Sequence, residues 1–301
     1  MPVVKPQGTR VLVTGANGYI GMWVVRTLLE QGYVVRAVVR SLERGKHMKA
    51  YFNSYGDKLE LSVVEDITKD GAFDEAVKDV DAIEHTASPS TFALEDPNAY
   101  ITPAVHGTLS ILESARKFGN KVKRIVITSS VLAMYITTTP VKATVIVDES
   151  FWNEKAIELV KEKGKEEEGI VKYSASKTLA EKAAWKFREK HKNEIQWDLV
   201  TIHPSFVLGG FNVSLLFKKR SFQRPGCFFA RFWNMIAKNK PDSELKDTLN
   251  FVDVRDTAAA HVAALRKEKA GDERFIVSTG KGMHLAENSY VLPKPAFVVQ
   301  N

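Results

Sequence analysis

The first half of the chain alternates between short apolar runs and longer amphipathic segments. Apolar runs predict five strands, which cover residues 11–13, 33–40, 59–64, 80–87 and 122–128. Helical periodicity predicts helices over residues 20–29, 72–77, 97–118 and 173–190. The run over 33–40 is almost wholly apolar, which is typical of a parallel strand buried on both faces. The alternation therefore predicts an α/β fold, a doubly wound parallel sheet with right-handed crossovers.

A glycine-rich turn joins the first predicted strand to the first predicted helix. Residues 14–21 read T-G-A-N-G-Y-I-G, so that glycines recur every third position. A diphosphate on a helix N-terminus needs free backbone N–H groups and no Cβ at the point of contact, and glycine provides both. We expect a dinucleotide to contact this loop, at Gly15, Gly18, Tyr19, Ile20 and Gly21. Three glycines also suit a plain structural turn, so the interpretation depends on residues further along.

The residue at the end of the second predicted strand bears on the choice of cofactor. Ligands of parallel sheets bind beyond the carboxyl ends of the strands, where this strand ends at Arg40. An acidic residue about 20 positions after the glycine loop holds the ribose of NAD, whereas an arginine there suits the 2′-phosphate of NADP. We therefore predict NADPH as the cofactor. Arg44 is either a second cation for this phosphate or a solvated helix residue.

Three side chains with complementary chemistry come from the fifth strand and a later helix. Tyr173 and Lys177 are four residues apart and therefore share one helix face, about 5–6 Å apart at Cβ. We expect the ammonium to lower the pKa of the phenol from its usual value near 10, so that Tyr173 exchanges a proton with a substrate oxygen. A serine after the fifth strand would polarise the same oxygen. Because side chains alternate along a strand, the pattern leaves Ser129 and Ser130 both open.

Composition narrows the class of protein. Hydrophobic residues make up 44% and charged residues 26%, as in ordinary globular proteins. The single cysteine, Cys227, excludes an internal disulfide and a cysteine cluster for zinc, and we expect no metal. The net charge is +7, but the lysines are scattered and mixed with glutamates, which favours a solvated surface over a nucleic-acid interface. With no secretory leader or apolar stretch of membrane length, we expect a cytoplasmic protein, a monomer or homodimer without membrane contact.

These motifs resemble those of the extended short-chain dehydrogenases/reductases. Further similarity lies in residues 85–89, 203–210 and 251–256, and the resemblance covers about residues 8–278. Within the family, the chain is most similar to the branch of dihydroflavonol reductase, cinnamoyl-CoA reductase and fungal NADPH-dependent aldehyde and carbonyl reductases, including methylglyoxal reductase. The resemblance implies a Rossmann domain over 1–203 and a smaller substrate lobe over 204–301, of which 246–278 pack back on the first domain.

The resemblance also implies roles for individual residues. Ser130, Tyr173 and Lys177 would be catalytic, and Lys177 would also contact the cofactor. Asp66 would accept a hydrogen bond from the adenine, which is favoured over the alternative that it or Thr68 is only a helix N-cap. The remaining expected cofactor contacts are Ile67, Thr86, Ala87, Pro204, Ser205 and Val207. His85 is expected to pack in the sheet.

The implied reaction is NADPH-dependent reduction of an aldehyde or ketone, with a small carbonyl compound as the partner. Two alternatives are an NAD-dependent sugar-nucleotide epimerase or dehydratase, which uses the same three side chains, and a non-catalytic NADP-sensing module. Three departures from the family pattern limit the transfer. His106 stands where an asparagine is common, residues 211–240 either line a substrate pocket or form a core helix and loop, and the tail after Val277 is short.

Overall fold

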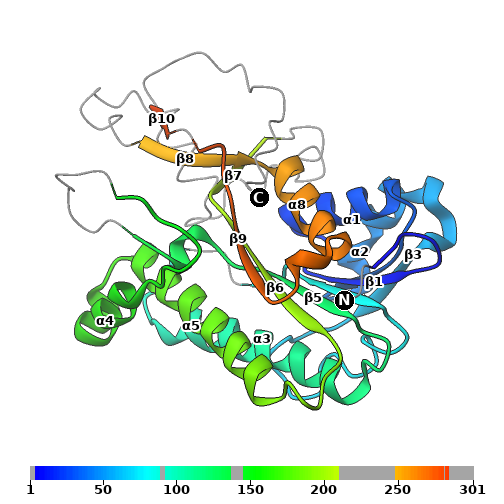
Figure 1. Cartoon of the computed structure of the whole chain (residues 1–301), viewed down its shortest axis with the longest axis horizontal. Coiled ribbons are helices and arrows are strands. Elements are labelled where there is room, and N and C mark those ends of the chain that lie inside the picture. Colours follow the sequence, from blue (N-terminus) through cyan, green and yellow to red (C-terminus); the bar gives the residue numbers. More distant parts are fainter. Residues whose placement is uncertain (1–3, 89–91, 137–144, 210–247, 281, 285–301) are drawn as a thin grey trace.

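The computed structural model describes residues 4–88, 92–136, 145–209, 248–280 and 282–284. The expectations for residues 211–240, for Cys227 and for most of the tail lie outside these ranges. Seven parallel strands form the centre of the fold, in the order β3-β2-β1-β4-β5-β6-β9 (Figure 1). Their bounds are β1 (Arg10–Thr14), β2 (Val34–Val39), β3 (Leu59–Val63), β4 (Ala82–His85), β5 (Arg124–Thr128), β6 (Asp198–Pro204) and β9 (Glu273–Val277). The sheet confirms the predicted doubly wound α/β fold.

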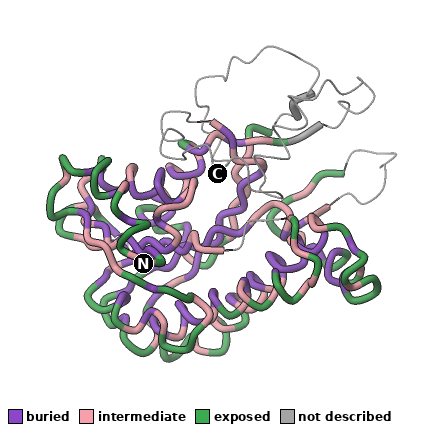
Figure 2. Tube along the Cα trace, turned by 180° about the vertical axis from the view of Figure 1, so that it is seen from behind, coloured by how far each residue is buried: buried purple, intermediate pink, exposed green. Residues whose placement is uncertain are grey.

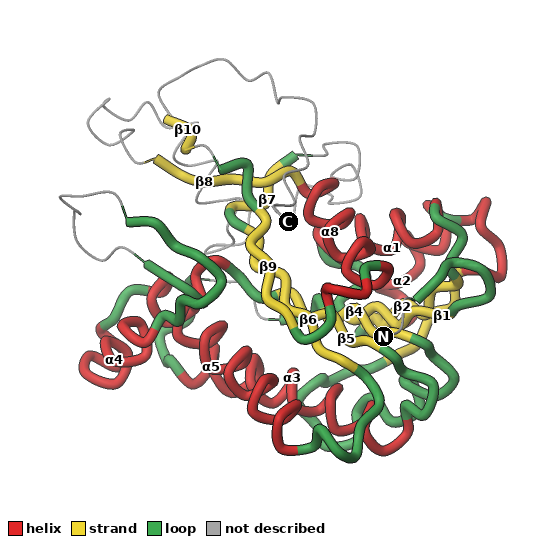
Figure 3. Tube along the Cα trace, in the orientation of Figure 1, coloured by secondary structure: helices red, strands yellow, loops and turns green. Residues whose placement is uncertain are grey.

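Helices cover both faces of this sheet (Figure 3). On one face, α1 (Tyr19–Glu30) and α8 (Val254–Arg266) share a core with β1 and β2, to which α2 (Leu42–Tyr51) contributes Met48. On the other face, α3 (Asn98–Phe118) and α5 (Gly169–Lys190) pack together, and α4 (Glu154–Lys163) lies against α5. The short 3₁₀ helices are η1 (Asn53–Lys58), η2 (Val131–Ala133), η3 (Gly164–Glu166) and η4 (Glu268–Ala270). Figure 2 shows that the buried residues concentrate in the central strands.

A second, three-stranded sheet lies beyond the main one. β7 (Phe206–Leu208) pairs in parallel with β8 (Thr248–Asp253), and β8 pairs antiparallel with β10 (Gly282–His284). After β8 the chain returns to the main sheet, because α8 packs in its core and β9 pairs with β6. A domain division at residue 203 stays a prediction. No helix within the described ranges is long and apolar enough to cross a membrane.

Two helix predictions are wrong in detail. The predicted helix over 72–77 is a series of turns. Gly71 and Asp79, which flank it, have φ of +72° and +59°, so that the backbone leaves the right-handed helical region at both ends. The helix of Tyr173 begins at Gly169 and not at the tyrosine, so Tyr173 lies in its second turn. This leaves the four-residue spacing to Lys177 within regular helix.

Candidate active site

The glycine loop packs closely against the residues that follow β4. Gly15 has a φ of +62°, and a Cβ at this position would lie 2.9 Å from the main-chain N and Cα of Ala87. A Cβ on Gly21 would collide with the main-chain oxygen of Gly15. Both positions therefore require glycine, and the loop presents bare backbone at the start of α1. The Tyr19 hydroxyl donates a hydrogen bond to the main-chain oxygen of Gly209 and so ties the loop to the segment after β7.

The carboxyl ends of β1 and β4 are joined by Thr14. Its hydroxyl lies 2.9 Å from Nδ1 of His85 and accepts a hydrogen bond from the Ala87 amide at 3.2 Å. The Thr86 hydroxyl in turn donates to the main-chain oxygen of Thr14 at 2.7 Å. His85 is buried in the sheet, as expected from the sequence. Burial, and then the nearby Lys177 ammonium, lower the pKa of His85 to about 3, so its ring is neutral.

Helix α5 brings Lys177 to the carboxyl end of β5. The buried ammonium donates a hydrogen bond to the main-chain oxygen of Thr128 at 3.2 Å. The same nitrogen lies 5.9 Å from the centre of the Tyr173 ring, and the edge of that ring packs on Phe92 with ring centres 5.1 Å apart. Lys177 and Tyr173 are thus together at the strand end that carries both candidate serines.

The two serines have different partners. Ser129 is buried, and its hydroxyl donates to Oε2 of Glu181 at 2.7 Å. Ser130 is only partly buried, and its oxygen accepts a hydrogen bond from the Leu132 amide at 3.1 Å, as the cap of η2. Ser130 donates no hydrogen bond to any residue in the described part of the chain. Ser130 is therefore the serine with a proton to offer a substrate, which favours it as the carbonyl-polarising residue.

The predicted net lowering of the Tyr173 pKa is wrong in this structure. Burial raises the pKa of Tyr173 above its usual range, because a desolvated phenolate is disfavoured. No hydrogen bond joins the two side chains, since the ammonium points instead to Thr128. Burial lowers the pKa of Lys177 to about 8, while the Glu181 carboxylate opposes this shift. At neutral pH the site therefore holds a protonated phenol beside an ammonium.

The residues expected at the adenine end lie past β2 and β3. Arg40 is exposed directly after β2. Asp66 is exposed, and its Oδ1 accepts hydrogen bonds from the amide and hydroxyl of Thr68, which lower the pKa of the carboxyl, with a smaller contribution from Arg40. Asp66 therefore caps a turn, not a helix, and its contact with adenine stays a prediction. The side chain of Ile67 packs against Gly107 of α3.

The other neighbours of the adenine end are local helix residues. Ser41 is the N-cap of α2, because its hydroxyl oxygen accepts from the Arg44 amide at 3.4 Å. Arg44 is exposed on the first turn of that helix. The second-cation role of Arg44 stays a prediction.

The segment from Pro204 to Val207 carries an unsatisfied polar atom. Pro204 ends β6, Val207 lies in β7, and between them the Ser205 amide donates to the main-chain oxygen of Val277 at 3.0 Å. The Ser205 hydroxyl is buried without a hydrogen-bond partner in the described part of the chain. A buried hydroxyl without a partner is costly, so this atom suits a ligand group. With the bare glycine loop, it fits a dinucleotide laid along the carboxyl edge of the sheet.

Sequence reasoning missed the buried polar groups behind this edge. Glu181 lies four residues after Lys177 and joins His203 and Arg274, and Glu84 pairs with His261 at 2.7 Å. The spacing of Glu181 from Lys177 was a usable signal, because residues four apart share a helix face. Their partners lie on β6, β9 and α8, which are distant in the sequence, and left no local pattern.

Comparisons with known proteins show the family to which the chain is similar. The model of the NAD dependent epimerase/dehydratase family matches residues 11–280. A putative NADPH-dependent methylglyoxal reductase of Candida albicans is 34% identical over 90% of this chain and 78% of its own length. A cinnamoyl-CoA reductase of Medicago truncatula is 35% identical over 90% of this chain and 76% of its own length. The crystal structure of Gre2 from Candida albicans in complex with NADPH superposes with a TM-score of 0.79, at 33% identity over 90% of this chain and 78% of that one.

Proposed function

Since the chain belongs to the NAD dependent epimerase/dehydratase family, we propose that it catalyses the NADPH-dependent reduction of an aldehyde or ketone to an alcohol. The observation that carries this proposal is the placement of Lys177, which bonds to the end of β5 while it lies beside Tyr173. A proton donor and a cation thereby lie at the end of the strand that leads into Ser130, at the edge where parallel sheets bind dinucleotides.

Each side chain has a defined part in the reaction. Ser130 donates a hydrogen bond to the carbonyl oxygen, which strengthens as negative charge develops there. Tyr173 gives its phenolic proton to that oxygen, and the Lys177 ammonium stabilises the phenolate that remains. When bound, NADPH would supply the hydride for the carbonyl carbon, with an alcohol and NADP⁺ as the products. Because burial raises the pKa of Tyr173, the phenol is in the protonated, donating form at neutral pH.

The cofactor would be held by backbone and by one cation. The loop from Gly15 to Gly21 would bind the diphosphate, and Arg40 the 2′-phosphate. Thr86, Ala87 and the segment around Ser205 would lie along the nicotinamide half. Arg40 and the relatives named as NADPH-dependent reductases support NADPH over a tightly held NAD, and with it reduction over epimerisation.

The direct test follows the loss of NADPH absorbance with a panel of aldehydes, ketones and ketoesters. Tyr173→Phe is expected to lose most of the turnover, by about 100-fold or more, because general acid catalysis contributes roughly 10²–10⁴-fold. Tyr51→Phe, an exposed tyrosine on α2, is the matched control and should keep wild-type turnover. Unchanged turnover in Tyr173→Phe would contradict the proposed role of Tyr173 as the proton donor. Purified protein that carries NAD and consumes no NADPH would favour the epimerase reading.

A further inference from the structure

A buried carboxylate lies behind the proposed active site, on the same helix face as Tyr173 and Lys177. Glu181 follows Lys177 by one helical turn, and its side chain is 1% exposed. Its Oε2 accepts from the Ser129 hydroxyl and lies against Nε2 of His203, both at 2.7 Å. Its Oε1 accepts hydrogen bonds from Arg274 Nε at 2.8 Å, Thr201 Oγ1 at 3.1 Å and Trp185 Nε1 at 3.3 Å. Five groups therefore surround one carboxylate.

These groups come from separate parts of the fold. Ser129 follows β5, His203 and Thr201 lie on β6, and Arg274 lies on β9. Glu181 itself belongs to α5, which carries the proposed acid and cation. A buried charge is costly unless it is fully hydrogen-bonded, and apolar residues of similar volume often stabilise a core as well. Apolar side chains could therefore pack α5 against the sheet without a carboxylate. Directed hydrogen bonds from a carboxylate do more, because they fix the position of α5 relative to the end of β5.

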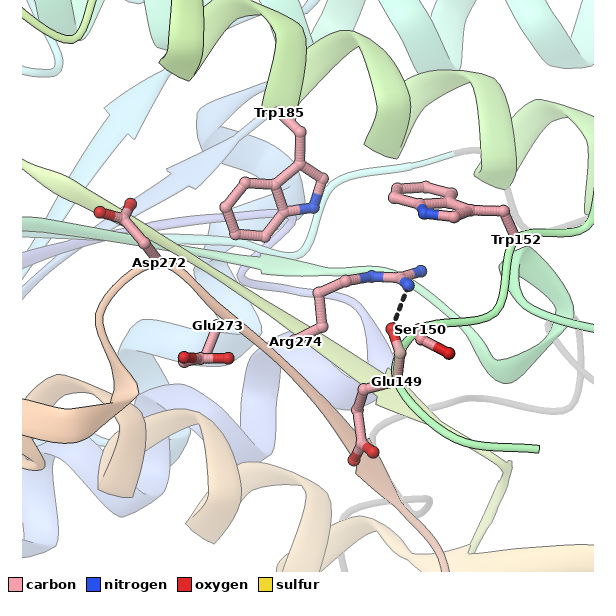
Figure 4. Close-up of a pocket in the computed structure, with 7 residues that line it drawn as sticks. All are labelled: Glu149, Ser150, Trp152, Trp185, Asp272, Glu273 and Arg274. Carbon is pink, nitrogen blue, oxygen red and sulfur yellow. Dashed lines mark hydrogen bonds between the residues drawn. The ribbon is translucent and has the colours of Figure 1, made fainter. Parts of the chain in front are cut away.

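Arg274 connects the buried Glu181 to residues nearer the surface. Its guanidinium donates to the main-chain oxygens of Glu149 and Phe151, and it stacks on Trp152 at 3.8 Å from the ring centre. Arg274 lines a pocket of about 370 Å³. Figure 4 shows its side chain below and between Trp152 and Trp185. The acidic residues Glu149, Asp272 and Glu273 also line this pocket. The carboxylate of Glu181 is thus anchored on its outer side by a cation that is itself held in place.

We propose that Glu181 is a positioning residue for the proposed carbonyl reduction. Its carboxylate binds the Ser129 hydroxyl, which sets the direction of the chain into Ser130, and it holds α5 against that strand end. It also keeps a negative charge one turn from Lys177, which favours the ammonium. Ser129 acts in this arrangement only through Glu181. The inference rests on the proposed function and adds to it a residue that touches neither substrate nor cofactor.

The first experiment replaces the charge with little change of shape. Glu181→Gln is expected to lower kcat at least tenfold, with the KM for the carbonyl and the Kd for NADPH within about twofold of wild type. Glu189→Gln, an exposed position further along α5, is the matched control and should match wild type. Because Glu181→Gln alters a buried network, circular dichroism and thermal unfolding establish that it is folded. Wild-type kcat in a folded Glu181→Gln protein would overturn the proposal.

The second experiment removes only the link to the strand end. Ser129→Ala should lower kcat several-fold, and the double variant should be no slower than Glu181→Gln alone, since Ser129 acts through the carboxylate. Ser129→Ala decides the question by itself if Glu181→Gln does not fold, and wild-type kcat in this variant would overturn the proposal. Independent, additive losses would equally contradict it.

A third measurement is independent of turnover. The groups that face Lys177 are Glu181 and Tyr173 on α5, His85 on β4, and Thr128, whose hydroxyl is 3.1 Å from His261 of α8. An NMR titration of the Lys177 side chain in the free protein should give a lower pKa in Glu181→Gln than in wild type, and an equal pKa would count against the proposal. Wild-type carbonyl reduction, assayed alongside, tests the proposed function separately. An active wild type with an unaffected Glu181→Gln would overturn only the inference.

Discussion

The ammonium of Lys177 donates a hydrogen bond to the main-chain oxygen of Thr128, 3.2 Å away. Thr128 is the last residue of β5, two positions before Ser130, so this bond fixes a positive charge at the strand end that carries the proposed carbonyl donor. The acceptor is part of the main chain of β5, whereas Lys177 belongs to α5. The position of the positive charge therefore depends on how α5 packs against β5. The behaviour of the site with pH should therefore follow Lys177.

The rate of reduction should fall as the solution becomes alkaline. Burial lowers the pKa of Lys177 to about 8, so the ammonium is lost as the pH rises through that value, whereas the raised pKa of Tyr173 keeps the phenol protonated. We expect kcat/KM to be level near pH 7 and to fall above about pH 8. Lys177→Arg should lower the rate but abolish this fall, because guanidinium stays charged. A wild-type profile that is level from pH 7 to 10 would contradict the assignment.

Arg40 should decide between the two nicotinamide cofactors. A charge-assisted hydrogen bond is worth about 1.5–3 kcal/mol, so Arg40→Ala should raise the Kd for NADPH by roughly tenfold or more and leave the Kd for NADH unchanged. Titration of protein fluorescence with each cofactor measures both constants. Arg266→Ala, an exposed arginine at the end of α8, provides the control. Equal weakening of NADPH and NADH by Arg40→Ala would argue against a 2′-phosphate contact.

Gly15→Ala should cost both stability and cofactor binding. The left-handed φ of +62° alone costs an alanine about 1–2 kcal/mol, and the added Cβ would also lie 2.9 Å from the backbone of Ala87. Gly8 separates the two effects, because it has a φ of +74° but nothing within 4 Å of an added Cβ. Urea unfolding should therefore show a larger loss for Gly15→Ala than for Gly8→Ala. Only Gly15→Ala should weaken NADPH binding. Equal losses of unfolding free energy in the two variants would mean that the backbone at Ala87 shifts to accommodate the added Cβ at little cost.

A buried ion pair at the opposite edge of the sheet should affect stability without affecting the site. Arg124 is fully buried at the start of β5, and its guanidinium binds both oxygens of Asp198 at 2.6 and 2.7 Å. Removal of one partner of such a pair costs about 3–5 kcal/mol, so Asp198→Asn and Arg124→Ala should sharply lower the free energy of unfolding. Where the variants remain folded, NADPH should bind as in wild type.

The matched control for that pair is the more exposed ion pair of Arg188 and Asp272. Its side chains are 20% and 47% exposed, and such pairs contribute only about 0–1 kcal/mol. Arg188→Ala should therefore change the free energy of unfolding by no more than about 1 kcal/mol. A loss as large as that of Arg124→Ala would show that burial is not what distinguishes the two pairs.

The sequence by itself determined the first five strands and the local chemistry of the site. Hydrophobic periodicity identified these strands, because a buried parallel strand must be apolar on both faces. The glycine loop and the spacing of Tyr173 and Lys177 were equally local, since a turn needs its glycines and four residues make about one helical turn. The helix expected over 72–77 is a series of turns, bounded by left-handed backbone at Gly71 and Asp79.

Only the tertiary structure decided which groups face each other. Strand periodicity left Ser129 and Ser130 equivalent, and they differ because Glu181, 52 residues after Ser129, takes one hydroxyl and not the other. Arg274, 93 residues after Glu181, completes that site. The raised pKa of Tyr173 likewise follows from burial by residues distant in the chain. Local sequence fixes spacing along one element, whereas burial and hydrogen-bond partners depend on how the elements pack.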